Sequence, residues 1–239
     1  MQCHHSIEDQ DTIKLCVAGV PIFNPLSNSE MQEVAQMGVS KTYLKGELIF
    51  QPEDSSENLL IIHKGKVKIY QVAESGKEQL LRILEPGDFM GELSLFTNEM
   101  VSSFAEAMVK TEICMIKRSD LQELLSNHPK ISMKILEEFG RRLSNAEKTI
   151  ERLSLQDMEK RTASYLVDLV KAHVDPENTL PPYQLTLPMS KKDLSSFIGT
   201  TQETLSRRLS TFQDRGWITQ TGQRNINILN FVALQDTAK

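Results

Sequence analysis

Two helix-start signals follow one another in the stretch SKKDLSSFIGTTQETLSRRLSTF, and they constrain the fold more than any other segment. Ser190 with Asp193 forms a capping box, and Gly199 ends the helix that this box starts. Thr200 with Glu203 predicts the start of a second helix. The residues WITQ and NINIL then alternate around a Thr-Gly turn, which predicts a hairpin. Helix, short turn, helix and hairpin together predict a winged helix-turn-helix.

The second helix has an apolar face and a polar face. Apolar side chains recur at Leu205, Leu209 and Phe212, in steps of four and three that predict an inward face. An α-helix fits the major groove of B-DNA, where a guanidinium donates twice to guanine and a carboxylate accepts from the cytosine amine. The residues that we expect to read DNA bases are therefore Glu203, Ser206 and Arg207. A helix-cap role for Glu203 and a solvated surface for the arginine are the alternatives.

Positive charge is concentrated at this end of the chain. Residues 188–239 carry seven Lys or Arg and four Asp or Glu, a net of +3, so the remainder carries −8 of the total of −5. This asymmetry favours a polyanionic partner for the C-terminal part, which we expect to be double-stranded DNA. The candidates for phosphate contacts are Lys191, Lys192, Thr200, Gln202, Arg208, Arg215 and Arg224. The alternative is a scaffold protein whose helix-turn-helix meets another protein.

Short apolar alternations separated by glycine turns fill residues 40–118. Examples are NLLIIHKGKVKIYQV and KEQLLRILEPGDF. Strand-like runs at roughly ten-residue spacing predict an antiparallel β-roll or jelly roll, so we expect an α+β fold. We place the roll, a sensor domain, at residues 19–128, after a flexible N-terminal arm at residues 1–18. Ser27 with Glu30 predicts a capped helix near the start of the roll.

A heptad repeat predicts a long helix over residues 129–155. Its apolar residues lie at alternating steps of three and four between charged neighbours, which is typical of a helix that faces a copy of itself. We therefore expect a dimerisation helix and a homodimer, with the winged helix-turn-helix domain at residues 156–239. The residues of this dimer seam are Leu136, Phe139, Leu143, Ala146, Ile150 and Leu153. The alternative is a helix that lies on the roll of its own chain.

Two motifs resemble those of the Crp–Fnr superfamily of bacterial transcription regulators. PGDFMGELSLF is similar to that family's roll signature, and SKKDLSSFIGTTQETLSRRL resembles its DNA-reading signature. The resemblance implies a cyclic-nucleotide-binding-type roll, a dimerisation helix, a winged helix-turn-helix and RNA polymerase as a partner. The pattern Glu203-x-x-Ser206-Arg207 matches the oxygen-regulator branch, which implies a palindromic site with half-sites similar to TTGAT. The chain also resembles the Fnr-like proteins of lactic-acid and related Gram-positive bacteria.

The resemblance places a ligand pocket in the roll. Gly91 and Glu92 match the family positions that meet the ribose of a cyclic nucleotide. The phosphate needs an Arg-Ser pair about ten residues further on, because a buried phosphate requires a charged, forked donor. Ser102 and Ser103 stand at that place instead. We therefore expect a vestigial pocket that does not take cyclic AMP.

Three cysteines, Cys3, Cys16 and Cys114, are the candidates for a redox switch. The oxygen-regulator branch holds an iron–sulfur cluster with four cysteines, and this chain is one ligand short, so we do not expect that cluster. Cys114 would pair with Cys3 or Cys16 if the arm folds over the roll, and this two-thiol pattern resembles the lactic-acid bacterial proteins. The alternatives are a buried, inert Cys114 and a metal site made from Cys3, His4, His5 and Cys16.

Several function classes are excluded by the sequence. No run of about 18 uncharged apolar residues is present and the N-terminus lacks the order of a signal peptide, so we expect a cytoplasmic protein that does not bind a membrane. No P-loop, HExxH or GxGxxG motif and no Ser–His–Asp order is present, so we do not expect an enzyme. A redox signal, a small molecule in the roll and the absence of any effector stay open, as does the choice between activation and repression.

Overall fold

Strands β1 to β8 form two four-stranded antiparallel sheets, which confirms the predicted roll. One sheet has the order β1-β8-β3-β6 and the other has the order β2-β7-β4-β5. The strands are β1 (Val39–Tyr43), β2 (Leu48–Phe50), β3 (Asn58–Lys64), β4 (Val67–Val72), β5 (Glu78–Leu84), β6 (Phe89–Met90), β7 (Phe104–Ala107) and β8 (Thr111–Lys117). Side chains of both sheets meet in one core, as in a sandwich of antiparallel sheets.

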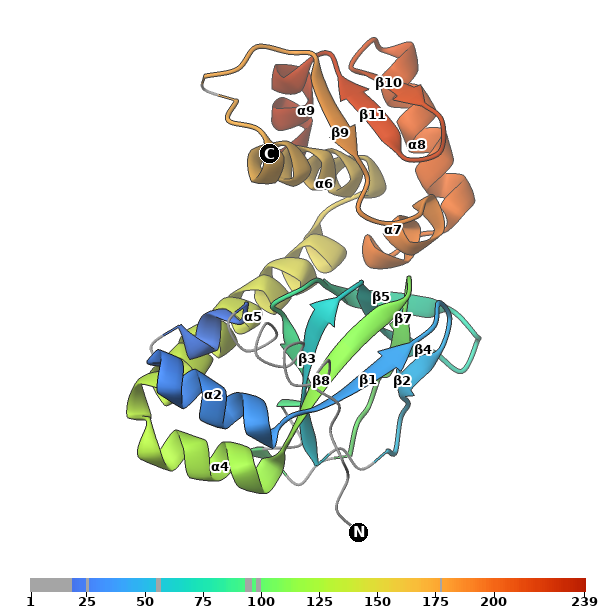
Figure 1. The fold of residues 1–239 in the computed structure, drawn as a ribbon. Coiled ribbons are helices and arrows are strands. Elements are labelled where there is room, and N and C mark those ends of the chain that lie inside the picture. Colours follow the sequence, from blue (N-terminus) through green and yellow to red (C-terminus); the bar gives the residue numbers. More distant parts are fainter. Residues whose placement is uncertain (1–18, 25, 55–56, 93–95, 98–99, 177) are drawn as a thin grey trace. The chain divides into compact units, whose positions relative to one another are not determined.

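The chain divides into two units, Met1–Arg142 and Leu143–Lys239. The division lies within one long helix, α5 (Pro129–Leu155), which is drawn in yellow-green in Figure 1. This computed structural model describes residues 19–24, 26–54, 57–92, 96–97, 100–176 and 178–239.

Strand β3 separates two hydrophobic cores. Leu60 and Ile62 lie in the core between the two sheets, together with residues of β4, β5 and β7. Leu59 and Ile61 lie in the second core, on the helical side of the sheet. Because both faces of β3 are buried, its sequence is a continuous apolar run instead of a strict alternation.

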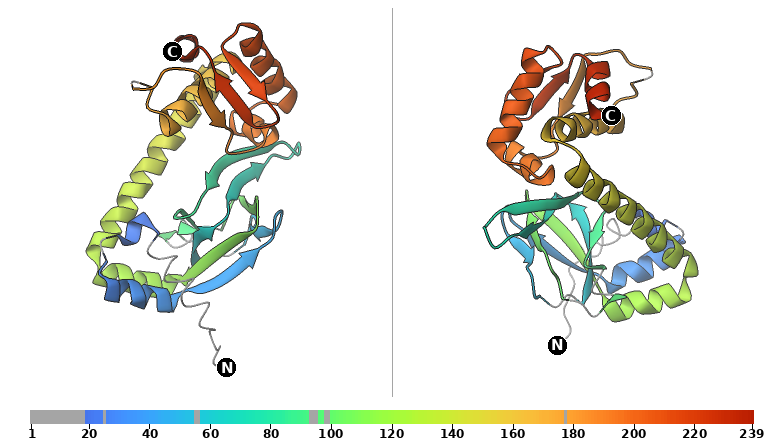
Figure 2. Two further views of the ribbon diagram at one scale, coloured as in Figure 1. Left: turned by 45° about the horizontal axis from the view of Figure 1, so that its top comes forward. Right: turned by 180° about the vertical axis from the view of Figure 1, so that it is seen from behind.

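Helices cover the outer face of the sheet that contains β3. They are η1 (Pro21–Phe23), α2 (Asn28–Met37), α4 (Arg118–Asn127) and the first turns of α5. Figure 2 shows α2 and α4 side by side in both views. The predicted capping box of α2 is confirmed, since Ser27 N donates to Glu30 Oε2 over 2.6 Å and Ser27 Oγ accepts from Glu30 N.

Two turns of the roll require glycine. Gly65 has φ +96°, and a Cβ there would lie 2.7 Å from a backbone oxygen of the β7–β8 turn. Gly87 has φ +93°, and a Cβ there would lie 2.7 Å from the backbone oxygen of Gly19. Side chains of L residues are strained in this backbone conformation. Asp88 closes the second turn by accepting a hydrogen bond from Glu85 N over 2.9 Å.

The C-terminal unit is the predicted winged helix-turn-helix. Its elements after α5 are α6 (Met158–His173), β9 (Tyr183–Thr186), α7 (Lys191–Phe197), α8 (Gln202–Asp214), β10 (Ile218–Thr221), β11 (Asn225–Ile228) and α9 (Phe231–Ala238). The predicted hairpin is β10–β11, and β9 adds a third strand beside β11. Sequence reasoning missed the short elements β9 and α9, although Asn230 caps α9 by accepting a hydrogen bond from Ala233 N over 3.0 Å.

Candidate nucleic-acid interface

Helix α8 begins one residue later than the sequence predicts. Its N-cap is Thr201, whose Oγ1 accepts a hydrogen bond from Thr204 N over 3.3 Å, so the assignment of Thr200 as the cap is wrong. Gly199 turns the chain out of α7 with φ +74°. Thr200 N then donates back to a carbonyl oxygen of α7 over 2.8 Å. Thr200 therefore closes the turn between the two helices, and α8 starts after it.

The apolar face of α8 is fully buried. Leu205, Leu209 and Phe212 each have an exposed fraction of 0%, which confirms them as core residues. The ring of Phe212 lies 5.3 Å from the ring of Trp217, just before β10. These contacts attach α8 to the rest of its unit and leave its opposite face in contact with solvent.

The opposite face of α8 carries the predicted base readers. The side chains of Glu203 and Arg207 are 73% and 75% exposed, and they hydrogen-bond to each other one helical turn apart. An exposed pair at this spacing contributes only about 0.3–0.5 kcal/mol, so base edges can replace it. Ser206, the third predicted reader, is half-buried. Base reading by these three residues stays a prediction.

Five candidates for phosphate contacts lie in α7, in the turn between α7 and α8, at the start of α8 and in the β10–β11 turn. Lys192, Gln202 and Arg224 are exposed, and Thr200 is half-buried. The fifth, Lys191, donates from Nζ to Gln220 Oε1 over 2.6 Å and so links the start of α7 to β10.

The other two candidates, Arg208 and Arg215, pair with a carboxylate that sequence reasoning missed. Glu159, in the first turn of α6, accepts from Arg208 Nη1 over 3.3 Å and from Arg215 Nη1 over 2.5 Å. Glu159 precedes Arg208 by 49 positions and Arg215 by 56 positions in the chain, so no local sequence pattern could have revealed the cluster.

The predicted dimer seam is only partly covered by its own chain. Leu136, Leu143 and Ile150 have exposed fractions of 60%, 63% and 63%, and Ala146 is exposed as well. Phe139 and Leu153 are half-buried. Phe139 packs against the helical core of the roll, so the first part of α5 also lies on its own chain.

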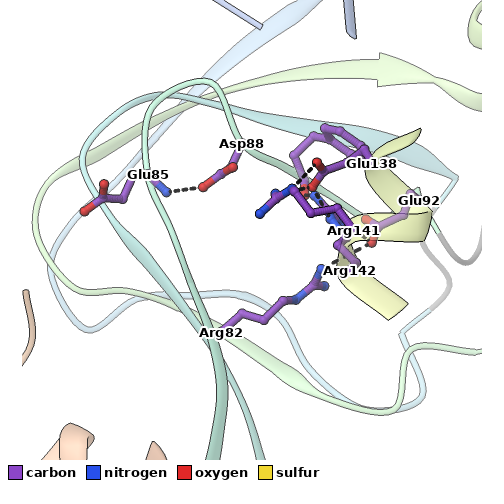
Figure 3. Close-up of polar contacts among 8 residues, drawn as sticks. Arg82, Glu85, Asp88, Glu92, Glu138, Arg141 and Arg142 are labelled. Atoms are coloured by element: carbon purple, nitrogen blue, oxygen red, sulfur yellow. Dashed lines mark hydrogen bonds and ion pairs between the residues drawn. The ribbon is translucent and has the colours of Figure 1, made fainter. Parts of the chain in front are cut away.

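A cluster of charged residues occupies the predicted ligand position of the roll (Figure 3). Glu92 is 4% exposed, and its Oε1 accepts a hydrogen bond from Arg142 of α5. Arg82 of β5 approaches the same oxygen at 3.6 Å. Arg142 also donates to Phe89 O over 2.9 Å and lies over the Phe89 ring, 4.3 Å from its centroid. Arg142 therefore connects the long helix to the roll through a buried carboxylate.

A second carboxylate holds Arg142 from the helix side. Glu138 accepts from Arg142 Nε over 2.7 Å and from Arg141 Nε over 2.8 Å. Burial alone would raise the pKa of Glu138, but these hydrogen bonds outweigh it and hold the pKa below the usual value. Burial lowers the pKa of Arg82, against the attraction of Glu92.

The remaining residues of the predicted pocket are Ser102, Ser103 and Gly91, which directly precedes Glu92 in the chain. Ser102 is exposed and Ser103 is half-buried, just before β7. Gly91 has φ +83° and turns the chain after β6. The carboxylate of Glu92 is engaged by arginines of the protein, at the position where the resemblance would place a ribose.

Cys114 lies in β8 with an exposed fraction of 0%, in the core on the helical side of the sheet. The other members of the predicted redox and metal sites, Cys3, His4, His5 and Cys16, fall outside the residues that the structure describes. Within residues 19–239, apart from the short gaps given above, no three His, Cys, Asp or Glu are grouped to hold a metal ion. Among the same residues no helix is both long and apolar enough to cross a membrane.

Comparison with known proteins agrees with the two-unit architecture. The cyclic nucleotide-binding domain family matches residues 40–128, and the Crp-like helix-turn-helix domain family matches residues 160–237. A solved structure of FixK2 from Bradyrhizobium japonicum is similar with a TM-score of 0.71. It has 24% sequence identity, and the alignment covers 84% of this chain and 98% of that one.

Two curated relatives extend over nearly the whole chain. A probable transcriptional regulator flp of Lacticaseibacillus casei is 32% identical, with 93% of this chain and 98% of the relative covered. The fumarate and nitrate reduction regulatory protein of Vibrio cholerae is 27% identical, with 99% of this chain and 91% of the relative covered. The sequence signatures, the fold and these relatives agree, and the chain belongs to the Crp–Fnr family of DNA-binding transcription regulators.

Proposed function

We propose that the chain is a homodimeric regulator that reads a palindromic DNA site with half-sites similar to TTGAT. Each α8 enters one major groove, and the two half-sites lie about one helical turn apart. The observation that carries this proposal is the division of α8 into a fully buried apolar face and an exposed polar face with Glu203 and Arg207. Because its apolar face is fixed in the core, α8 presents both side chains to a groove, with Glu203 one helical turn before Arg207.

The chemistry of the exposed face suits such a half-site. TTGAT contains one G·C pair, which offers a guanine edge to Arg207 and a cytosine amine to Glu203. Their mutual hydrogen bond holds both side chains on the same side of α8. Lys191, Lys192, Thr200, Gln202 and Arg224 would contact phosphate and set the register.

The dimer is supported by the exposed apolar residues of α5. Leu136, Leu143 and Ile150 repeat every seven residues and are all more than half exposed, which suits contact with the same helix of a second chain. A regulator of this kind acts in the cytoplasm on the chromosome, with RNA polymerase as its partner, and needs no catalytic centre of its own.

The DNA reading is tested by fluorescence anisotropy with a palindromic TTGAT duplex and a shuffled duplex. Arg207→Ala should reduce the preference for the palindrome by about 1–3 kcal/mol. Lys239→Ala is the matched control, because it removes an exposed cation of α9 that pairs with Asp236. Equal preference in wild type and Arg207→Ala, or no binding of either duplex, would contradict the proposal.

A redox signal is the first candidate for the effector, through a bond between Cys114 and either Cys3 or Cys16. Cys114 is fully buried in β8, in the same core as Val20. Two thiols would lose two protons and two electrons to an oxidant such as diamide and form one S–S bond. Equal DNA affinity in reduced protein, diamide-treated protein and a Cys16→Ser variant would contradict the switch.

A roll that needs no nucleotide is the second candidate, and the Arg142–Glu92 pair favours it. The protein's own guanidinium already joins α5 to the position that a ribose would occupy. Saturating cyclic AMP should then leave both the DNA affinity and the melting temperature unchanged. A rise in either would show that a nucleotide displaces the internal pair.

A further inference from the structure

Glu159 ties two arginines of the recognition helix to α6. Its carboxylate accepts from Arg208 Nη1 over 3.3 Å and from Arg215 Nη1 over 2.5 Å. Arg208 lies in the middle of α8, and Arg215 is the C-cap residue of the same helix. One acidic side chain therefore pairs with two cations that lie about two helical turns apart.

This cluster adds little to the stability of the fold. The side chains of Glu159, Arg208 and Arg215 are 26%, 41% and 43% exposed, and water screens ion pairs at such exposure. The guanidinium of Arg215 also lies over the ring of Trp217, 4.9 Å from its centroid, which helps to hold it independently of the carboxylate. The larger effect of Glu159 is on the charge that this side of the unit presents.

That charge bears directly on DNA binding. Contacts from Lys or Arg to phosphate strengthen binding to every sequence, and each adds about 0.9 to the slope of log affinity against log salt concentration. Arg208 directly follows the predicted base reader Arg207 and is rotated from it by about 100° around α8, so it flanks the face that would enter the groove. With both guanidiniums released, any duplex could gain contacts that carry no sequence information.

Resting on the proposed function, we propose that Glu159 is a specificity-determining residue that withholds Arg208 and Arg215 from DNA phosphates. It keeps binding to unrelated DNA weak, so that the time spent on DNA depends on the bases that α8 reads. A genome offers a vast excess of unrelated sites, and even a modest gain in affinity for them lowers the occupancy of the target.

The test compares wild type with Glu159→Gln in the full-length protein. Anisotropy titrations with the TTGAT palindrome and the shuffled duplex are run over a range of salt concentrations. Glu159→Gln should bind the shuffled duplex about tenfold more tightly, with a salt slope steeper by about one to two per protomer. Adding Arg208→Gln and Arg215→Gln to this variant should return both quantities to their wild-type values.

Asp236→Asn is the matched control. It removes one carboxylate and releases Lys239 from an exposed pair of 2.7 Å on α9, and it should leave the slope unchanged. Unchanged far-ultraviolet circular dichroism shows that each variant is folded.

Two outcomes would overturn the inference. The first is unchanged or weaker binding of the shuffled duplex by Glu159→Gln. The second is a shallower salt slope when Arg208→Gln and Arg215→Gln are introduced with Glu159 present, since both arginines would then contact phosphate in the wild type. Wild-type binding without sequence preference would instead refute the proposed base reading, and the shuffled duplex would still decide the role of Glu159.

Discussion

Replacement of Arg142 by methionine should destabilise the roll more than any substitution on the exposed surface of α5. The change keeps most of the aliphatic length and removes the charge that neutralises Glu92, whose exposed fraction is 4%. Removal of one partner from a buried ion pair costs about 3–5 kcal/mol, because the other charge stays buried without compensation. Arg82, at 3.6 Å, retains part of the attraction, so we expect about 3 kcal/mol.

Urea unfolding can measure this loss for each unit separately. Cys114 has an exposed fraction of 0%, so in a Cys3→Ser, Cys16→Ser background a thiol reagent reacts with it only when the roll opens. Trp217 is the only tryptophan of the chain and reports on the C-terminal unit. With an m value of about 2 kcal/mol per M, the midpoint of the roll should fall by about 1.5 M at fixed protein concentration. The Trp217 transition should not move.

The neighbouring arginine supplies the control for Arg142→Met. Arg141 is 60% exposed and pairs with Glu138, so Arg141→Met should cost less than about 1 kcal/mol. Adding Glu92→Met to Arg142→Met should restore part of the lost stability, because the Glu92 charge is then no longer buried, although Arg82 loses its partner. A midpoint for Arg142→Met equal to that of Arg141→Met would refute the reasoning.

Three further predictions concern the seam, the recognition helix and acid stability. Leu143→Asp should convert the dimer to monomer in analytical ultracentrifugation, and a variant that stays dimeric would contradict the seam. Phe212→Ala should lower the stability of the C-terminal unit by about 3–5 kcal/mol in urea unfolding followed by Trp217 fluorescence, because it opens a cavity beneath α8; a loss below about 1 kcal/mol would show that the core repacks. Glu138 has a pKa below its usual 4.5 in the folded roll, so its contribution is complete above pH 4.5 and is lost as the pH falls through the folded pKa. Acid unfolding of Glu138→Gln should lack this part of the pH dependence, and a profile identical to wild type would contradict it.

The elements of the recognition unit could be predicted because their signals are local. Ser190 N-caps α7 as expected, and the spacing of Leu205, Leu209 and Phe212 defines the buried face of α8 within three turns. The same locality explains the error at the start of α8. Adjacent threonines both suit a cap, and the closing hydrogen bond of the α7 turn, which the sequence does not show, decides between them.

The polar clusters could not be predicted because they join distant parts of the chain. Arg142 and Glu92 are 50 positions apart in the chain. In the sequence, Arg142 is only one of several charged residues that flank the heptad seam. Only the packing of α5 on the roll brings its guanidinium to a buried carboxylate. Glu159 is similar, since its charge looks like ordinary helix-surface charge until α6 and α8 are folded together.

The two-sided burial of β3 has a consequence for how the roll finds its strand alignment. The residues on its two faces are alternately Leu59, Leu60, Ile61 and Ile62, so a slip by one position would keep leucine or isoleucine at three of these sites and bring His63 or Asn58 to the fourth. In most sheets such a slip places polar side chains along the whole buried face, and here that penalty is confined to one end of the strand. The correct alignment of β3 must therefore be set by the ends of the strand, above all by the tight glycine turn at Gly65. The apolar middle of the strand does little to decide which residues pair.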